Sequence, residues 1–323
     1  MWWRALVALA AAEASSSLDG VEVAGRGGAP LCGGDCGLCF LDMGANMGVQ
    51  TRKVFEARNY STFPGPHPPL WRLLNAHFGL DRGAWQRGCS VGFEPSPYLW
   101  PRLRELGARY AELGFKATFL RAGVGAEAAR KCLADGRGER GKVVGCDASA
   151  TAPTPVVDVA DFLREHVAPG VVAVAKLDVE EAEYAILPRL LATRAHCLVS
   201  AWGVEWHRPS AADRAAVRSA WERATRPRNR TACSSSREMD DETFRLDPLP
   251  LPRRAGGAAD DWSTKTVQSD GPFWIPEGDR EAPPRGPPPW LGRSREKRRR
   301  DAERRRARPP PKEEDRSTNI VAY

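Results

Sequence analysis

The feature that most constrains the fold is an almost unbroken apolar run, VVAVAKLDV, at residues 171–179. A strand that is apolar on both faces must be covered on both faces, which is typical of a central strand in a parallel sheet. Shorter apolar runs at 38–43, 90–93 and 115–120 alternate with stretches whose apolar residues recur at helical spacing. This alternation predicts an α/β fold with a mostly parallel sheet and helices on both faces.

The pattern continues after the central run. Residues 181–191 (EAEYAILPRLL) place apolar side chains on one helical face, residues 197–206 read as another strand, and residues 210–224 read as a helix. Pro188 is expected to kink or shorten the first of these helices, because proline cannot donate its backbone hydrogen bond.

Composition divides the chain into four parts. The first carries one arginine, a short apolar run and a small-residue cleavage pattern, which is typical of a signal peptide. The last is rich in proline and arginine, a composition that predicts disorder. The expected parts are a signal peptide at 1–17, a Gly- and Cys-bearing lead-in at 18–37, a globular domain at 38–275 with a proline-rich insertion at 60–89, and a disordered tail at 276–323.

The positive charge is concentrated in that tail. Residues 293–308 hold ten Lys or Arg and three Asp or Glu, so this segment alone carries the formal +7 of the whole chain. The rest is formally neutral, whereas a nucleic-acid enzyme more often spreads positive charge over its folded surface. Nucleic acid is therefore not the favoured partner. The basic run remains open to three interpretations: a solvated charged segment, a nuclear-localisation or nucleic-acid arm, or a segment that binds acidic glycans or anionic lipid.

Three features together favour the secretory pathway, either the lumen of the endoplasmic reticulum or Golgi or the exterior. They are the candidate signal peptide, the even number of cysteines (eight) and the N-glycosylation sequons at Asn59 and Asn229. An oxidising compartment would permit disulfides. Only an uncleaved N-terminal segment is expected to tether the chain to a membrane.

The first candidate site is the sequence Leu41-Asp42-Met43-Gly44-Ala45-Asn46-Met47-Gly48, which follows a strand and begins a helix. Glycines at such a turn let the backbone approach a ligand closely. The helix N-terminus then offers free N–H groups to a carboxylate or phosphate. An ordinary glycine-rich turn would look the same.

The second candidate is Glu94, which ends the next strand in the sequence Val91-Gly92-Phe93-Glu94-Pro95. A carboxylate in this position can accept hydrogen bonds from both hydroxyls of a ribose, as expected for an adenosine site. The sequence separation between Asp42 and Glu94 is wider than in a compact βαβ unit, and the insertion at 60–89 accounts for the additional residues.

The third and fourth candidates follow the next two strands. Asp178 and Glu180 belong to the acidic sequence KLDVEEAE after the central strand, which suits a general base or a cation site. His207, in Glu205-Trp206-His207, could take a proton from a hydroxyl, although a lone histidine is more often structural. A charged helix N-terminus would also explain the acidic run.

These motifs, in the order LDMGANMG, VGFEPSP, VDVADFL, AKLDVEEAEYAIL and VEWH, resemble FkbM-type methyltransferases over residues 38–207. The resemblance implies a class I Rossmann-like fold with a seven-stranded-type sheet, S-adenosyl-L-methionine as cofactor, and methyl transfer to oxygen on a glycan or small molecule. The implied catalytic candidates are Asp178, Glu180 and His207. The implied cofactor-binding residues are Asp42, Gly44, Asn46, Gly48 and Glu94; no metal ligand is implied.

Two departures from the family pattern keep alternatives open. Glu181 stands where the family usually has glycine, and no acidic residue for the adenine edge is evident at 121–126, although Asp147 is a candidate. A Rossmann-like module that binds a partner or glycan without turnover is therefore one alternative. A nucleic-acid methyltransferase that uses the basic tail is another.

A rival hypothesis rests on the C-x3-C-x2-C spacing of Cys32, Cys36 and Cys39, which resembles the iron–sulfur motif of radical S-adenosylmethionine enzymes. Leu38 stands in place of the usual aromatic residue, and no clear strand precedes the motif. Zinc lacks an obvious fourth ligand. Disulfides or buried thiols are the favoured interpretation.

Overall fold

The structure is a computed structural model that describes residues 17–25, 30–57, 69–79, 88–134, 142–146, 153–208, 212–226 and 232–239. The chain divides into two units, 1–272 and 273–323, and every described residue belongs to the first. The predicted signal peptide up to residue 16, both sequons, Asp147 and the tail lie outside the described residues.

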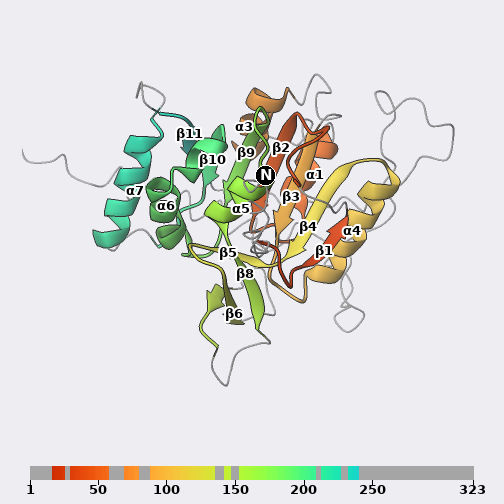
Figure 1. The fold of residues 1–323 in the computed structure, drawn as a ribbon, viewed down its shortest axis with the longest axis horizontal. Coiled ribbons are helices and arrows are strands. Elements are labelled where there is room, and N and C mark those ends of the chain that lie inside the picture. The colour runs from red at the N-terminus through yellow and green to blue at the C-terminus, as the bar shows by residue number, and fades with distance from the viewer. Residues whose placement is uncertain are drawn as a thin grey trace, which may run out of the picture. The chain divides into compact units, whose positions relative to one another are not determined.

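The described residues form a seven-stranded sheet in the order β1-β4-β3-β2-β9-β10-β11 (Figure 1). Five of the neighbouring pairs are parallel and the edge pair β1–β4 is antiparallel, so the sheet is mixed. The strands are β1 (Glu22–Gly25), β2 (Leu38–Met43), β3 (Gly88–Phe93), β4 (Lys116–Arg121), β9 (Val172–Leu177), β10 (Ala201–Val204) and β11 (Ser235–Glu238).

A second, four-stranded sheet has the order β5-β8-β6-β7. Its strands are β5 (Gly123–Gly125), β6 (Ala129–Ala134), β7 (Lys142–Val144) and β8 (Thr154–Asp158). The β5–β8 pair is parallel, and the other two pairs are antiparallel. No sequence pattern predicted the short strands β5, β6 and β7.

Helices cover both faces of the seven-stranded sheet, and two hydrophobic cores fill the spaces between. One core joins the sheet to α5, α6 and Trp221 of α7, and the other joins it to α1, α3 and α4. The helices are α1 (Val49–Phe55), α3 (Pro69–Phe78), α4 (Trp100–Glu112), α5 (Val159–His166), α6 (Glu183–Ala192) and α7 (Ala212–Ala224), with a 3₁₀ turn, η3 (Ala195–Leu198).

Strand β9 is apolar apart from Lys176 because both of its faces are buried. Ala173, Ala175 and Leu177 enter the core beneath α5 and α6, while Val174 enters the core beneath α1 and α3. The side chains of a strand alternate between faces, so a strand covered on both sides has no polar face. The expectation of a central parallel strand is confirmed, because β9 pairs in parallel with β2 and β10.

The structure adds detail to three local predictions. The strand expected at 197–206 is divided into η3 and the shorter β10. Helix α6 runs through Pro188 without ending there. Part of the expected insertion at 60–89 forms α3, whose Leu70, Leu74 and Phe78 are buried in the sheet core.

All eight cysteines lie within the described residues and form disulfides, which leaves none of them to bind a cluster or zinc. The pairs are Cys32–Cys39, Cys36–Cys89, Cys132–Cys146 and Cys197–Cys233. Disulfides favour an oxidising compartment, in agreement with the predicted secretory route. Among the helices that the structure describes, none has the length and apolarity to cross a bilayer.

Candidate functional site

The candidate site lies where β2 and β9 run side by side at the centre of the sheet. From β2 the chain proceeds to β3 and β4 on one side, while from β9 it proceeds to β10 on the other. Parallel sheets bind ligands at the carboxyl ends of their strands at such a switch point. The strand ends here carry Gly44, Glu94, Asp178 and His207, which are four of the predicted site residues.

The turn after β2 packs tightly against the end of β9. Gly44 has φ +94°, and a Cβ at this position would collide with the carbonyl oxygen of Asp178. Gly48 has φ +82° at the start of α1, where a Cβ would press on Leu106. Asn46 also has a positive φ, 51°. Glycine is required at the first two positions because L side chains there would be both strained and crowded.

Glu94 closes this turn from the end of β3. Its Oε2 accepts the backbone N–H of Asn46 at 2.8 Å and its Oε1 accepts the backbone N–H of Ser96 at 2.9 Å. The side chain is buried, and this desolvation raises the pKa of Glu94 to about 7 despite the two backbone hydrogen bonds. Each oxygen can still accept a further hydrogen bond, because a carboxylate oxygen has two acceptor positions.

Asp42 lies beneath the turn rather than on its surface. It is wholly buried, and burial raises its pKa to about 6. Oδ2 is 3.5 Å from the Thr51 hydroxyl, and Oδ1 has no hydrogen-bond partner among the described residues. The positive charge of Lys176, which is also buried, partly opposes this rise in the pKa of Asp42. Direct contact between Asp42 and a ligand would require the turn to open.

Lys176 links the two halves of the site. Its ammonium donates to Asp178 Oδ2 at 2.6 Å and to the carbonyl oxygen of Gly44 at 3.3 Å. Burial alone would lower the pKa of Lys176, but the carboxylates of Asp178 and Asp42 raise it instead. A buried lysine held as a cation therefore fixes the relative positions of the β2 and β9 ends.

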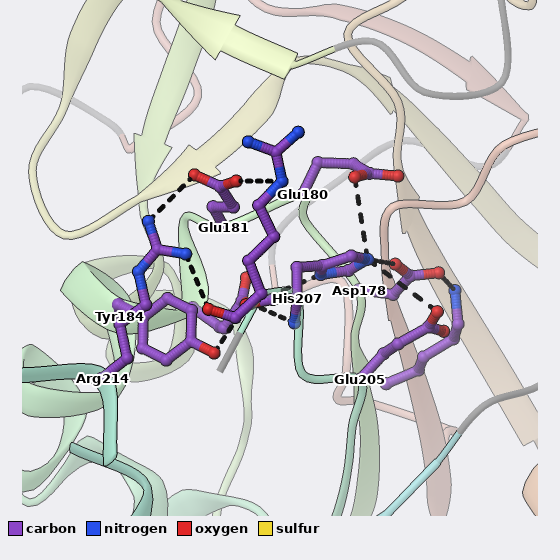
Figure 2. Close-up of polar contacts among 10 residues, drawn as sticks. Asp178, Glu180, Glu181, Tyr184, Glu205, His207 and Arg214 are labelled. Carbon is purple, nitrogen blue, oxygen red and sulfur yellow. Dashed lines mark hydrogen bonds and ion pairs between the residues drawn. The ribbon is translucent and has the colours of Figure 1, made fainter. Parts of the chain in front are cut away.

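His207 is surrounded by carboxylates from two strand ends and one helix (Figure 2). Its Nε2 is 3.4 Å from Asp178 Oδ1, 3.8 Å from Glu180 Oε2 and 3.8 Å from Glu205 Oε1. Its Nδ1 is 3.3 Å from Glu183 Oε1. Burial alone would lower the pKa of His207, but the carboxylates of Glu183, Glu180 and Asp178 raise it to about 9. Asp178, Glu180 and His207, predicted as candidates, are thus brought together.

Glu181 replaces the expected glycine but keeps a glycine-like backbone. Its φ is +80°, and Glu180 before it has φ +49°. The Glu181 carboxylate lies 3.1 Å from Arg208. It also lies 3.3 Å from Arg214 (Figure 2). Glu181 thus adopts a φ that favours glycine, and its charge is balanced by arginines outside the His207 cluster.

Sequence reasoning did not single out Lys176, Glu183 or Glu205. A lysine within the apolar run was the available signal for Lys176. Glu183 lies on the same helical face as Ile186 and Leu187, so its periodicity already pointed to the interior.

No protein-family model, curated protein or solved structure matches the chain. The geometry of these strand ends and the residues that they carry are therefore the basis for a function.

Proposed function

We propose that the chain is an S-adenosyl-L-methionine-dependent methyltransferase with a Rossmann-like fold, and that it methylates a hydroxyl oxygen on a glycan or small molecule. One observation carries the proposal. A glycine turn, a buried acceptor carboxylate and a proton-accepting cluster meet at the ends of β2, β3 and β9, at the switch point of the sheet.

The residues fit the cofactor on two counts. Glu94 is held by two backbone N–H groups and keeps acceptor capacity on both oxygens, as recognition of a ribose diol requires. Gly44 and Gly48, at positive φ, let the turn pack against Asp178 and Leu106, which fixes the backbone of residues 44–48 beside Glu94. Glu94 would bind the ribose hydroxyls, and residues 44–48 would line the methionine portion. Asp42 would act from beneath the turn, because its charge favours the cationic form of Lys176.

The cofactor supplies an electrophilic methyl carbon. The chain's task is to orient an acceptor hydroxyl and take up its proton, which supplies much of the rate of such a transfer. Asp178 and Glu180 offer carboxylate oxygens for that proton. His207 lies between them and, with its raised pKa, carries positive charge at neutral pH that attracts a developing alkoxide.

The test is calorimetric titration of S-adenosylhomocysteine, which has no methyl group to transfer, into the oxidised full chain. Glu94→Gln is the test variant and Glu112→Gln, an exposed glutamate on α4, is the control. We expect micromolar-range binding that Glu94→Gln weakens by about tenfold or more, because it loses charge-assisted hydrogen bonds. Glu112→Gln should bind like wild type. Absence of heat from folded wild-type protein, or equal binding by Glu94→Gln, would refute the assignment.

A further inference from the structure

We propose that Asp178, Glu205 and His207 form a binding site for a first-row divalent cation of the Mn²⁺ or Zn²⁺ class. Their candidate ligand atoms all lie within 4.8 Å of one another. The distances from His207 Nε2 to the Asp178 and Glu205 oxygens, 3.4 and 3.8 Å, are close to the separation of about 3.4 Å between ligands bound tetrahedrally at about 2.1 Å. An ion placed between them would reach all three atoms after small side-chain movements.

The scaffold beneath these residues is rigid. Asp178 and Glu205 directly follow β9 and β10, which pair in parallel, and the backbone N–H of Glu205 donates to the carbonyl oxygen of Leu177 at 2.9 Å. His207 comes two residues later. Sites built at strand ends hold their ligands more precisely than sites built on loops.

An independent observation concerns the orientation of His207. Glu183 is wholly buried, and its Oε1 accepts the backbone N–H of His207 at 2.8 Å and lies 3.3 Å from Nδ1. The Tyr184 hydroxyl donates to the His207 carbonyl oxygen at 2.6 Å. A carboxylate beside Nδ1 keeps a proton on Nδ1, so an incoming ion displaces the proton on Nε2 and binds the lone pair that faces Asp178 and Glu205. Histidines that bind metals are oriented by carboxylates in this way.

Charge favours a cation at this point. Four carboxylates lie within 4 Å of the imidazole ring nitrogens, those of Asp178, Glu180, Glu183 and Glu205. The cation Lys176 contacts one of them, Asp178. Lys176 binds Asp178 Oδ2 and leaves Oδ1 directed toward His207. A metal ion would replace the proton on Nε2 as the positive charge that these carboxylates stabilise.

The donor set indicates the type of ion. One imidazole nitrogen and two carboxylate oxygens suit zinc or manganese better than calcium, which prefers six to eight oxygens. The Asp178 side chain is 26% exposed and that of Glu205 is 22% exposed, so water or an acceptor oxygen could complete the coordination. The role of the ion in polarising a hydroxyl rests on the proposed methyl transfer. Binding of the ion does not depend on the proposed methyl transfer.

The experiment measures Mn²⁺ binding to the oxidised, chelator-treated full chain, by loss of the electron paramagnetic resonance signal of free Mn²⁺. No cofactor is present, so the outcome is independent of the S-adenosylhomocysteine titration. We expect one Mn²⁺ per chain, with affinity lowered about tenfold or more in Asp178→Asn, Glu205→Gln and His207→Ala. Glu183→Gln, which removes both the carboxylate that orients His207 and one nearby negative charge, should lower affinity by a similar factor.

Two controls separate this site from nonspecific binding. His77→Ala removes a histidine on α3, and Glu112→Gln removes an exposed carboxylate on α4; both should bind Mn²⁺ like wild type. Circular dichroism confirms that each variant is folded. The proposal is overturned if the folded wild type binds no Mn²⁺, or if the conservative variants Asp178→Asn and Glu205→Gln bind it as tightly as the controls do.

Discussion

The Cys36–Cys89 disulfide should contribute about 4 kcal/mol to the stability of the domain. It closes a loop with a sequence separation of 53 residues, and the chain-entropy relation for a loop of this length gives that value at 25 °C. The bond joins the segment just before β2 to the start of β3, at the end of the sheet opposite the candidate site. Its loss should therefore lower stability while leaving the geometry of Gly44 and Glu94 unchanged.

The perturbation is the double variant Cys36→Ala/Cys89→Ala, measured by urea unfolding without reductant. A loss of about 4 kcal/mol corresponds to a fall in Tm of about 8–16 °C for a domain of this size. Cys132→Ala/Cys146→Ala, with a sequence separation of 14, is the matched control and should cost about 3 kcal/mol. If the Cys36/Cys89 variant loses less than about 1 kcal/mol, or if unfolded wild type shows two free thiols, the pairing is wrong.

Three further predictions concern the strand ends. Gly44→Ala should destabilise the protein by more than about 3 kcal/mol in urea unfolding, because it adds left-handed strain and a backbone collision with Asp178; a smaller loss would contradict the turn geometry. The pKa of Glu94, about 7 in the folded protein against an ordinary value of 4.5, implies that the folded state binds an extra proton between these pH values. The stability of the wild type therefore falls as pH rises from 4.5 to about 7. Between pH 5 and pH 8, the free energy of unfolding of Glu94→Gln should rise by up to about 3 kcal/mol relative to that of the wild type; parallel pH profiles would refute this. Asp158→Ala should cost about 1–3 kcal/mol, because Asp158 caps α5 through Ala160 N–H and pairs with Arg189, whereas Asp158→Asn should cost less by keeping the cap; equal losses would show that the cap is unimportant.

The central strands could be predicted from the sequence because both of their faces are buried. Each strand is therefore a mostly apolar run, without the alternation of apolar and polar residues that a half-exposed strand shows. The parallel pairing of β9 followed from that run alone, and the positions of Gly44, Glu94 and Asp178 at strand ends followed from where each run stopped. The strand expected at 197–206 was drawn too long because η3 is also apolar, and short apolar runs do not distinguish a strand from a helical turn.

The sheet edges could not be predicted in this way. Strand β1 pairs antiparallel with β4, and β11 (SSRE) is a polar strand that joins β10 in parallel. Edge strands are partly solvated, so their sequences carry little hydrophobic signal. A proline in α6 was expected to disturb the helix, but Leu187 and Leu190 on either side of Pro188 are buried, and tertiary packing outweighs the lost hydrogen bond.

The environment of His207 shows what a sequence can and cannot say about a site. Asp178, Glu180 and His207 were identifiable because each follows a strand, and parallel strands end at one edge. Their mutual distances depend on Glu183, which faces inward from α6 to hold the His207 backbone, and on Lys176, which holds one oxygen of Asp178. Both are charged residues in apolar patterns, where burial is costly unless a partner is present. A charged residue at a position that periodicity assigns to the core is therefore the signal that locates the residues supporting a site. Here Lys176 of β9 orients Asp178, and Glu183 of α6 orients His207.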